Sequence, residues 1–388
     1  MTPAPTRPSP RIAIASPGVG RVQRGFERLF SDIFQLMRGE FDITMLKGGG
    51  PPAPDEKVPL FLHRNGAVLR TLPVHRLFGR TPFHSECMMF ALGMLPHLRG
   101  GAYDIVHTID APLTRVLFRL RARLGLRFTL LYTEGAGMAP SDYPPADHTH
   151  QIAQVAMDQA LAFGYRPDGM TLLPCGIYPE RFTTPRSRAE LRREHGIPDD
   201  TFVVLSVAAL NRGQKRTDYL VNEMAGLDGN WLLLLDGSTD HGDPGLADLA
   251  RQRLGDRVRI SHVPSGKVRE LYALADVLAH VSMFESFGLA IVEAASCGLP
   301  VIIHDGPHFR WLVPNPNCWI DAAPAGALAA KLRQVMADPA ALAAMRADAV
   351  TNERFSWHRL RPQYADLYRH VAALPVQHAS EADCRRAA

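Results

Sequence analysis

Cysteine is scarce in this chain of 388 residues, where five cysteines lie far apart and none forms a C-x-x-C pair. A disulfide framework or a cysteine zinc site needs such pairs or clusters, so the sequence predicts neither. We therefore expect a protein of the reducing cytoplasm. No apolar run is long enough to span a membrane, and the first residues lack the apolar segment of a signal peptide.

An excess of one charge is also missing, because 43 Lys and Arg stand against 39 Asp and Glu. No basic patch is interleaved with aromatic residues, which argues against nucleic-acid binding. The most basic run is 115–127, where Arg115, Arg119 and Arg123 share one face of an expected helix, 112–124. We favour an ordinary solvated helix face. Peripheral contact with an anionic membrane, at its inner face, or with a polyanionic acceptor is the alternative.

What the sequence does contain is a regular alternation of strand and helix patterns, which predicts parallel sheets covered by helices on both faces. We expect strands at 11–15, 41–46, 103–107, 127–132 and 170–173, then at 202–207, 231–235, 258–261, 277–281 and 301–303. Helical patterns lie near 25–37, 84–98, 112–124, 149–162 and 357–374. Ligands of such folds bind at the carboxyl ends of the strands.

A turn-rich connector, 174–182, divides the pattern into two halves. We expect one α/β domain over 11–175 and a second over 176–352. The Pro-rich residues 1–10 and the residues 376–388 are expected to be a disordered lead-in and tail.

The densest motif of the chain runs from 281 to 303. A buried strand leads to Glu285, a helix begins near Gly288, and Glu293 follows about two turns inside that helix. Free N–H groups in the first turn can bind phosphate, and a glycine lets a ligand approach the backbone. At 1.5 Å rise per residue the two carboxylates lie on the order of 10 Å apart, which suits a nucleotide diphosphate sugar. An ordinary buried helix is the alternative, but Glu293 in an apolar helix would be costly without a partner.

This run resembles the signature of the retaining glycosyltransferases of family 4: Glu, seven residues, Glu, with Ser-Phe-Gly-Leu after the first and Ala-Ala-Ser-Cys-Gly-Leu-Pro-Val after the second. The resemblance implies the α/β GT-B fold, two Rossmann-like domains with parallel sheets facing a central cleft. It also implies that 353–375 is a C-terminal helix that crosses back to the first domain.

The family's roles fall on matching residues here. The resemblance implies that Glu285 contacts the donor sugar, that Glu293 holds the ribose, and that backbone amides hold the distal phosphate and sugar. The residues that supply these amides are Ser286, Phe287, Gly288 and Leu289. Backbone groups around Val263 are the expected readers of the nucleobase.

Two cations follow the strand at 202–207. Lys215 matches the family's diphosphate-binding lysine, whereas Leu210 or Ala209 stands where an arginine is usual. Arg212 could replace that arginine from the same loop. Solvated loop cations are the alternative for Arg216 and, less so, for Lys215.

The turn after the first strand contains Gly18, Gly20 and Arg24 but is not G-x-G-x-x-G, which weakens a dinucleotide-binding interpretation. In the related fold this turn faces the donor phosphate, so all three residues are donor-site candidates. Plain tight-turn glycines are the alternative.

His107 ends a predicted strand and is a candidate catalytic residue by resemblance; a hydrogen-bonded core histidine is equally consistent. Glu134 replaces a histidine usual in the family and could bind an acceptor hydroxyl. The Asp147-His148-Thr149-His150 run has metal-ligand residue types, but a helix cap suits it better, and the related fold requires no metal.

The sequence thus predicts a retaining hexosyltransferase-type enzyme that moves a sugar from a nucleotide diphosphate sugar to the hydroxyl of a glycan, lipid-linked or small-molecule acceptor. We expect no metal and no further cofactor. A non-catalytic nucleotide-sugar-binding or regulatory protein on the same fold is the alternative.

Overall fold

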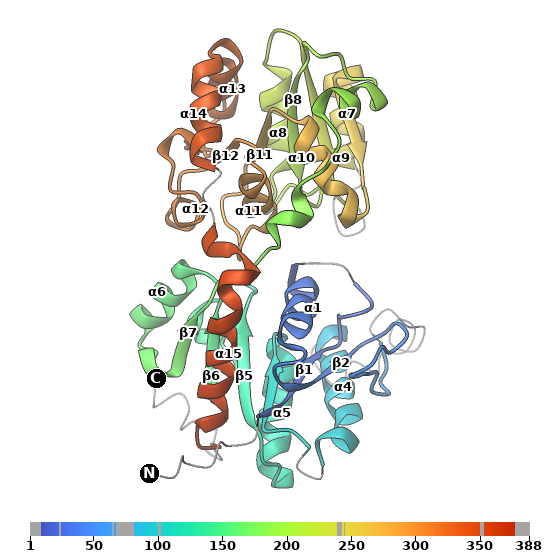
Figure 1. The fold of residues 1–388 in the computed structure, drawn as a ribbon, viewed down its shortest axis with the longest axis vertical. Helices are drawn as coiled ribbons and strands as arrows, with labels where there is room; N and C mark the ends of the chain where they lie inside the picture. Colours follow the sequence, from blue (N-terminus) through green and yellow to red (C-terminus); the bar gives the residue numbers. More distant parts are fainter. Residues whose placement is uncertain are drawn as a thin grey trace. The chain divides into compact units, whose positions relative to one another are not determined.

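The computed structural model describes residues 9–22, 25–63, 66, 81–99, 102–238, 243, 245–349 and 353–376. The chain divides into two compact units (Figure 1). Unit 1 takes the chain up to Cys175 and again from Arg359, and unit 2 takes Gly176–His358. Most of the predicted lead-in and tail lies outside the described residues. Among the residues described, no helix is both long and apolar enough to cross a membrane.

Unit 1 is built on a seven-stranded parallel sheet of order β3-β2-β1-β4-β5-β6-β7. Its strands are β1 (Arg11–Ser16), β2 (Asp42–Lys47), β3 (Glu56–Lys57), β4 (Ile105–Thr108), β5 (Thr129–Glu134), β6 (His148–Gln151) and β7 (Met170–Leu172). Its helices are α1 (Gly25–Met37), α4 (Pro82–Leu98), α5 (Ala111–Leu124), α6 (Gln154–Phe163) and most of α15 (Trp357–Ala373), with short 3-10 turns at Pro140–Asp142 and Pro167–Gly169.

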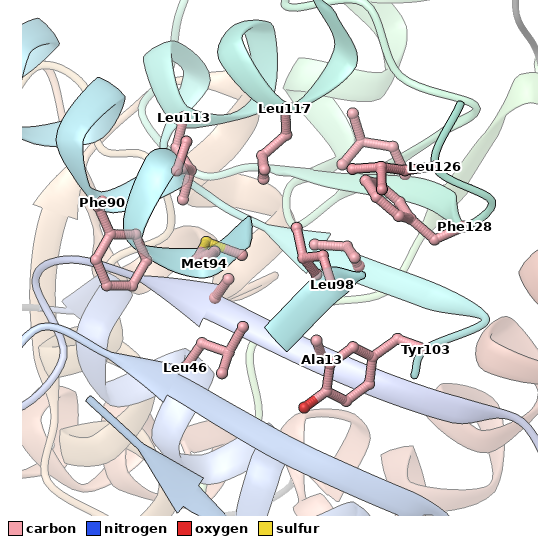
Figure 2. Packing of buried hydrophobic residues seen from close by; sticks show 14 of the residues in the cluster. Ala13, Leu46, Phe90, Met94, Leu98, Tyr103, Leu113, Leu117, Leu126 and Phe128 are labelled. Carbon is pink, nitrogen blue, oxygen red and sulfur yellow. The ribbon is translucent and has the colours of Figure 1, made fainter. Parts of the chain in front are cut away.

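One face of this sheet is covered by α4 and α5. Apolar side chains recur on the inner faces of these helices, and the strands offer alternate small and branched residues to them. Figure 2 shows Phe90 and Met94 of α4 and Leu117 of α5 directed toward Ala13 and Leu46 of the sheet. Because helices cover both faces, β1 is buried at every residue from Ile12 to Ser16, as a parallel strand requires.

The other face of the sheet holds a chain of hydrogen bonds between α15 and three strands. His107 of β4 contacts Tyr368 through Nδ1 (2.9 Å) and Thr133 of β5 through Nε2 (2.6 Å). Thr133 also contacts His150 Nδ1 on β6 (2.9 Å), and His150 Nε2 lies 2.8 Å from the carbonyl of Leu173. Polar groups buried here are thereby satisfied.

The Leu173 carbonyl sets the direction of this chain. A carbonyl only accepts, so His150 Nε2 carries a proton and His150 Nδ1 accepts from the Thr133 hydroxyl. The Thr133 oxygen then accepts from His107 Nε2, and His107 Nδ1 accepts from Tyr368. A second proton on either imidazole would force the hydroxyl group that faces it to turn its own proton elsewhere. Burial lowers the pKa of both His107 and His150, which favours the neutral rings.

Unit 2 has a six-stranded parallel sheet of order β10-β9-β8-β11-β12-β13, the doubly wound order with its reversal between β8 and β11. The strands are β8 (Phe202–Val207), β9 (Trp231–Asp236), β10 (Val258–Ser261), β11 (Val277–His280), β12 (Val301–His304) and β13 (Trp319–Ile320). The helices are α7 (Arg188–Glu194), α8 (Thr217–Ala225), α9 (Gly245–Leu254), α10 (Val268–Leu274), α11 (Leu289–Ser296), α12 (Pro307–Leu312), α13 (Ala327–Ala337) and α14 (Pro339–Ala349). Short 3-10 turns lie at Pro179–Phe182, Gly255–Arg257, Ser265–Lys267, Pro316–Cys318 and Glu353–Phe355.

The beginning and the end of unit 2 are joined to each other. The N–H of Ile177 donates to the carbonyl of Phe355 (2.8 Å), and the N–H of Trp357 donates to the carbonyl of Ile177 (2.9 Å). A Cβ on Gly176 would lie 2.2 Å from the Trp357 ring, so this close approach requires glycine. The two segments that connect the units are thus fixed beside each other within unit 2.

One predicted element is wrong. Residues 149–162 were expected to be a single helix, with Asp147 as its cap, but residues 148–151 form β6 and the helix begins at Gln154. The segment is polar, unlike most buried parallel strands, because its side chains bond across the sheet. His148 reaches Thr171 (2.8 Å), and Asp147 pairs with the buried Arg121.

We expect acid to loosen the docking of α15 on unit 1. Burial lowers the pKa of His150 from its ordinary 6.5 to about 4, so the unfolded state takes up this proton first. Stability is complete above pH 6.5 and falls as the pH drops from 6.5 toward 4, by about 3 kcal/mol for His150 alone. Hydrogen exchange of the α15 amides, corrected for intrinsic rates, should show lower protection at pH 5 than at pH 7.

The histidine-free helix α13 provides the internal reference for this measurement. Equal loss of protection in both helices, or none in α15, would contradict the expectation. His148 lies in the same unit, and burial lowers its pKa to about 4 as well.

Candidate active site

The reversal of strand order in unit 2 brings two loops together. β8 and β11 are hydrogen-bonded neighbours, and the chain leaves their carboxyl ends in opposite directions. The loop after β8 carries Lys215, and the loop after β11 carries Glu285. Such a switch point is the usual ligand crevice of an open α/β sheet.

Glu285 is the electrostatic centre of this crevice, with only 8% of its surface exposed. Its Oε1 accepts hydrogen bonds from Lys215 Nζ (2.5 Å) and His280 Nε2 (2.8 Å), and its Oε2 accepts one from Gln214 Nε2 (3.2 Å). Burial by itself raises the pKa of Glu285, but the bonds and charges of His280 and Lys215 outweigh burial and lower the pKa to about 2. The carboxylate is therefore ionised at neutral pH.

The loop that presents Lys215 is shaped by Asn211. The Asn211 side chain accepts from the N–H of Lys215 (2.8 Å), while its backbone N–H donates to the hydroxyl of Thr217 (3.2 Å). Arg216 adopts the left-handed conformation, with φ of 51°, just before α8. Its guanidinium donates to the carbonyl of Ala322 and lies over the Tyr219 ring, so Arg216 serves the loop's structure.

Gly288 begins the motif helix α11 in the left-handed conformation, with φ of 94°. A Cβ there would lie 3.1 Å from Ile291 and 3.2 Å from Leu312. Within the described part of the chain, the N–H groups of Leu289 and Ala290 donate to no protein acceptor. These free donors at a helix N-terminus can bind an anion.

Glu293 is buried in α11, and its Oε2 accepts from the hydroxyl of Tyr272 on α10 (2.9 Å). Tyr272 thereby supplies a partner to a carboxylate that burial would otherwise penalise. The loop before α11 is held by His308, whose Nε2 donates to the carbonyl of Phe287 (2.9 Å). Ser286, like Gly288 and Leu289, is partly exposed, whereas the Phe287 ring is buried.

Two predicted donor-site residues of unit 2 are held by other groups. Arg212 is 49% exposed and pairs with Asp243 (2.5 Å) and Asp218 (3.8 Å), whereas Lys215 pairs with Glu285. The N–H of Val263 donates to Asp236 (2.8 Å), so a side chain of the unit already occupies this amide. Roles for both residues stay predictions.

Gly18 and Gly20 of unit 1 allow close packing, Gly18 against α1 and Gly20 against the loop after β2. A Cβ on Gly18 would lie 2.3 Å from the Glu27 carboxylate, and a Cβ on Gly20, where φ is 79°, would lie 2.1 Å from the carbonyl of Gly49. This is the tight-turn alternative considered above, and a donor contact through these glycines stays a prediction. Arg24 lies outside the described residues.

His107 and Glu134 are both engaged inside unit 1. His107 is 0% exposed and uses both ring nitrogens in the chain to α15, so its catalytic role stays a prediction that our proposal does not use. Glu134 accepts from the Tyr132 hydroxyl (2.7 Å) and the N–H of Met138 (3.1 Å). Burial raises the pKa of Glu134 more than these hydrogen bonds lower it. Its carboxylate holds the loop after β5, and acceptor binding stays a prediction.

Sequence reasoning missed the residues that support the motif: Gln214, Tyr272, His280 and His308. His280 had a detectable signal, because it is a polar residue at the carboxyl end of a buried strand next to the Glu285 loop. The other three are recognised only from contacts. Among the described residues, no three His, Cys, Asp or Glu side chains gather as metal ligands.

Residues 187–354 match the family model described as glycosyl transferases group 1. The matched segment covers most of the domain that unit 2 forms. The resemblance found from the motif is thereby confirmed. Over 79% of its length the chain is 29% identical to a D-inositol 3-phosphate glycosyltransferase from Saccharomonospora viridis, covering 80% of that protein. It is also 31% identical to the lipopolysaccharide glucosyltransferase WaaG of Escherichia coli, over 39% of this chain and 42% of WaaG.

Solved structures confirm the predicted GT-B fold around this domain. A sucrose-phosphate synthase from Thermosynechococcus elongatus superposes with a TM-score of 0.76 at 21% identity, covering 94% of this chain and 99% of that one. Anabaena HepE, determined in complex with UDP and glucose, gives a TM-score of 0.72 at 18% identity, covering 92% and 99%.

We expect Gly288→Ala to destabilise unit 2 more than a left-handed conformation alone explains. Gly326, where φ is 89°, also precedes a helix, but a Cβ there would meet nothing within 4 Å. Gly326→Ala should therefore cost only the backbone strain of about 1–2 kcal/mol. Gly288→Ala adds the contacts with Ile291 and Leu312. Urea unfolding of both variants measures the difference, and equal midpoints would contradict tight packing at Gly288.

Proposed function

We propose that this protein is a retaining glycosyltransferase that transfers a sugar from a nucleotide diphosphate sugar to an acceptor hydroxyl. One observation carries the proposal: the switch point of unit 2 presents an ionised Glu285, a lysine and the free N–H groups of a helix that also bears Glu293. The group 1 match and the fold support it.

The donor fits these groups in order along α11. Glu293 lies inside the helix and is assigned to the ribose hydroxyls, which donate to a carboxylate. The amides of Leu289 and Ala290, with Lys215, are assigned to the diphosphate, whose negative charge suits a helix N-terminus and an ammonium group. Glu285, at the mouth of the helix, is then assigned to the sugar.

Catalysis in this assignment is mainly electrostatic. As the glycosidic bond breaks, negative charge grows on the leaving diphosphate and positive charge on the sugar. Lys215 and the helix amides stabilise the first, and the ionised Glu285 stabilises the second. Both oxygens of Glu285 already accept hydrogen bonds, so we assign it positioning and charge stabilisation rather than nucleophilic attack.

The relatives suggest classes of substrate for this chain. HepE was determined with UDP-glucose, and WaaG and the D-inositol 3-phosphate glycosyltransferase are named for a lipopolysaccharide and a sugar-like polyol phosphate. The acceptor proposed here is accordingly a glycan, a glycolipid or a small polyol, and the reaction needs no metal in this proposal. A non-catalytic nucleotide-sugar-binding protein is the alternative, and turnover separates the two.

A cytoplasmic location with peripheral membrane contact through residues 112–124 also stays a proposal. The structure engages one residue of the basic face on which it rests, because Arg115 donates to the carbonyl of Asp142. Arg119 and Arg123 remain exposed on α5.

We expect wild-type protein to bind one class among UDP, GDP, ADP and TDP in a calorimetric titration, and Glu293→Gln to weaken that binding. Losing a charged hydrogen bond to the ribose costs about 1.5–3 kcal/mol, or about 10- to 100-fold in Kd. Glu180→Gln, at an exposed carboxylate of the same unit, is the control and should bind as wild type. Unchanged affinity in Glu293→Gln would remove its ribose role.

We expect Lys215→Ala to reduce turnover about 100-fold, the typical effect of losing one group that stabilises transition-state charge. The assay is release of nucleoside diphosphate from the nucleotide sugar that the titration identifies. Lys267→Ala removes an exposed lysine of unit 2 and should leave turnover unchanged. Wild-type turnover in Lys215→Ala would exclude Lys215 from the diphosphate site.

A further inference from the structure

His280 approaches the same carboxylate oxygen as Lys215. It is the last residue of β11, only 4% exposed, and its Nε2 lies 2.8 Å from Glu285 Oε1. Lys215 Nζ lies 2.5 Å from the same atom, on a loop and at the end of a flexible side chain. One carboxylate oxygen thus has two donors that differ in mobility.

The proposed function places incompatible demands on Lys215. Without donor, Lys215 pairs with Glu285; with donor, it is needed at the diphosphate. A carboxylate oxygen as buried as Glu285 Oε1 cannot lose all its hydrogen-bond donors without a large penalty. Gln214 does not replace the lysine, because its amide contacts the other oxygen, Oε2.

We infer that His280 is a positioning residue that holds Glu285 in place while Lys215 moves to the diphosphate of the donor. This inference rests on the proposed function. His280 suits the role because a strand fixes it: its backbone pairs in register with Ile303 of β12. Glu285 then keeps one short hydrogen bond in both states, and its orientation toward the sugar does not depend on where Lys215 is.

The inference predicts a separation between binding and turnover. His280 touches neither the α11 amides nor Glu293 in any described contact, so His280→Leu should leave the Kd for the nucleoside diphosphate within about twofold of wild type. Turnover of the nucleotide sugar should fall about 10- to 100-fold, because a misplaced Glu285 stabilises less of the developing charge.

The dependence of turnover on pH should change as well. The fall of turnover at acidic pH should begin at a higher pH than in wild type, since Glu285 loses a hydrogen-bond partner. Lys215 and His308 are the other titratable groups that face Glu285.

A matched pair of variants guards against a mere loss of folding. A glutamine amide nitrogen can reach the place of His280 Nε2, whereas an asparagine nitrogen matches only Nδ1. His280→Gln should therefore recover most of the turnover, and His280→Asn should resemble His280→Leu. All three variants are assayed as full-length chains, with nucleoside diphosphate affinity as the measure of an intact unit 2.

The outcomes separate the two proposals. If wild type binds and turns over a nucleotide sugar while His280→Leu keeps wild-type turnover and pH profile, the role of His280 is overturned and the proposed function stands. Equal turnover of His280→Gln and His280→Asn also overturns that role, including when His280→Leu does not fold. A wild type that neither binds nor turns over any nucleotide sugar overturns both.

Discussion

A buried carboxylate must keep hydrogen-bond donors, and this requirement organises the crevice of unit 2. Glu285 is held ionised at its depth by His280 and Lys215, which come from the end of β11 and from the loop after β8, the two strands between which the sheet reverses its order. The loop after β8, the end of β11 and the mouth of α11 therefore have to be built to fit one another. Three residues help to shape these elements. Gly288 begins α11 in the left-handed conformation, Asn211 holds the loop of Lys215, and Tyr272 donates to Glu293.

Much of this arrangement could be predicted from the sequence. Runs of branched apolar residues marked most strands to within a few residues, and their alternation with helical patterns indicated parallel sheets. The two glutamates with Gly288 between them indicated the motif helix, because glycine, helix start and buried acid each have a local physical signature. Lys215 was recognised for a similar reason, since it follows a strand in a loop that leads to a helix.

What could not be predicted depends on partners distant in the sequence. β6 was read as helix because its polar residues are stabilised by Thr171 and Leu173, which only the folded sheet brings near. Glu134 and His107 have the residue types of catalytic groups, and nothing local reveals that their polar atoms are used inside unit 1. Arg212 is similar: its pairing with Asp243 follows from a loop that begins more than twenty residues later.

The division of the chain between the units bears on how the protein is made. Unit 2 is one continuous segment, whereas unit 1 is assembled from residues on both sides of it. The face of the unit 1 sheet that carries His107 and His150 is completed only by Tyr364 and Tyr368 of α15. On the ribosome these tyrosines emerge after the whole of unit 2. The half synthesised first is thus the last that can reach its native structure, and until then its polar sheet face lacks the two tyrosines that complete it.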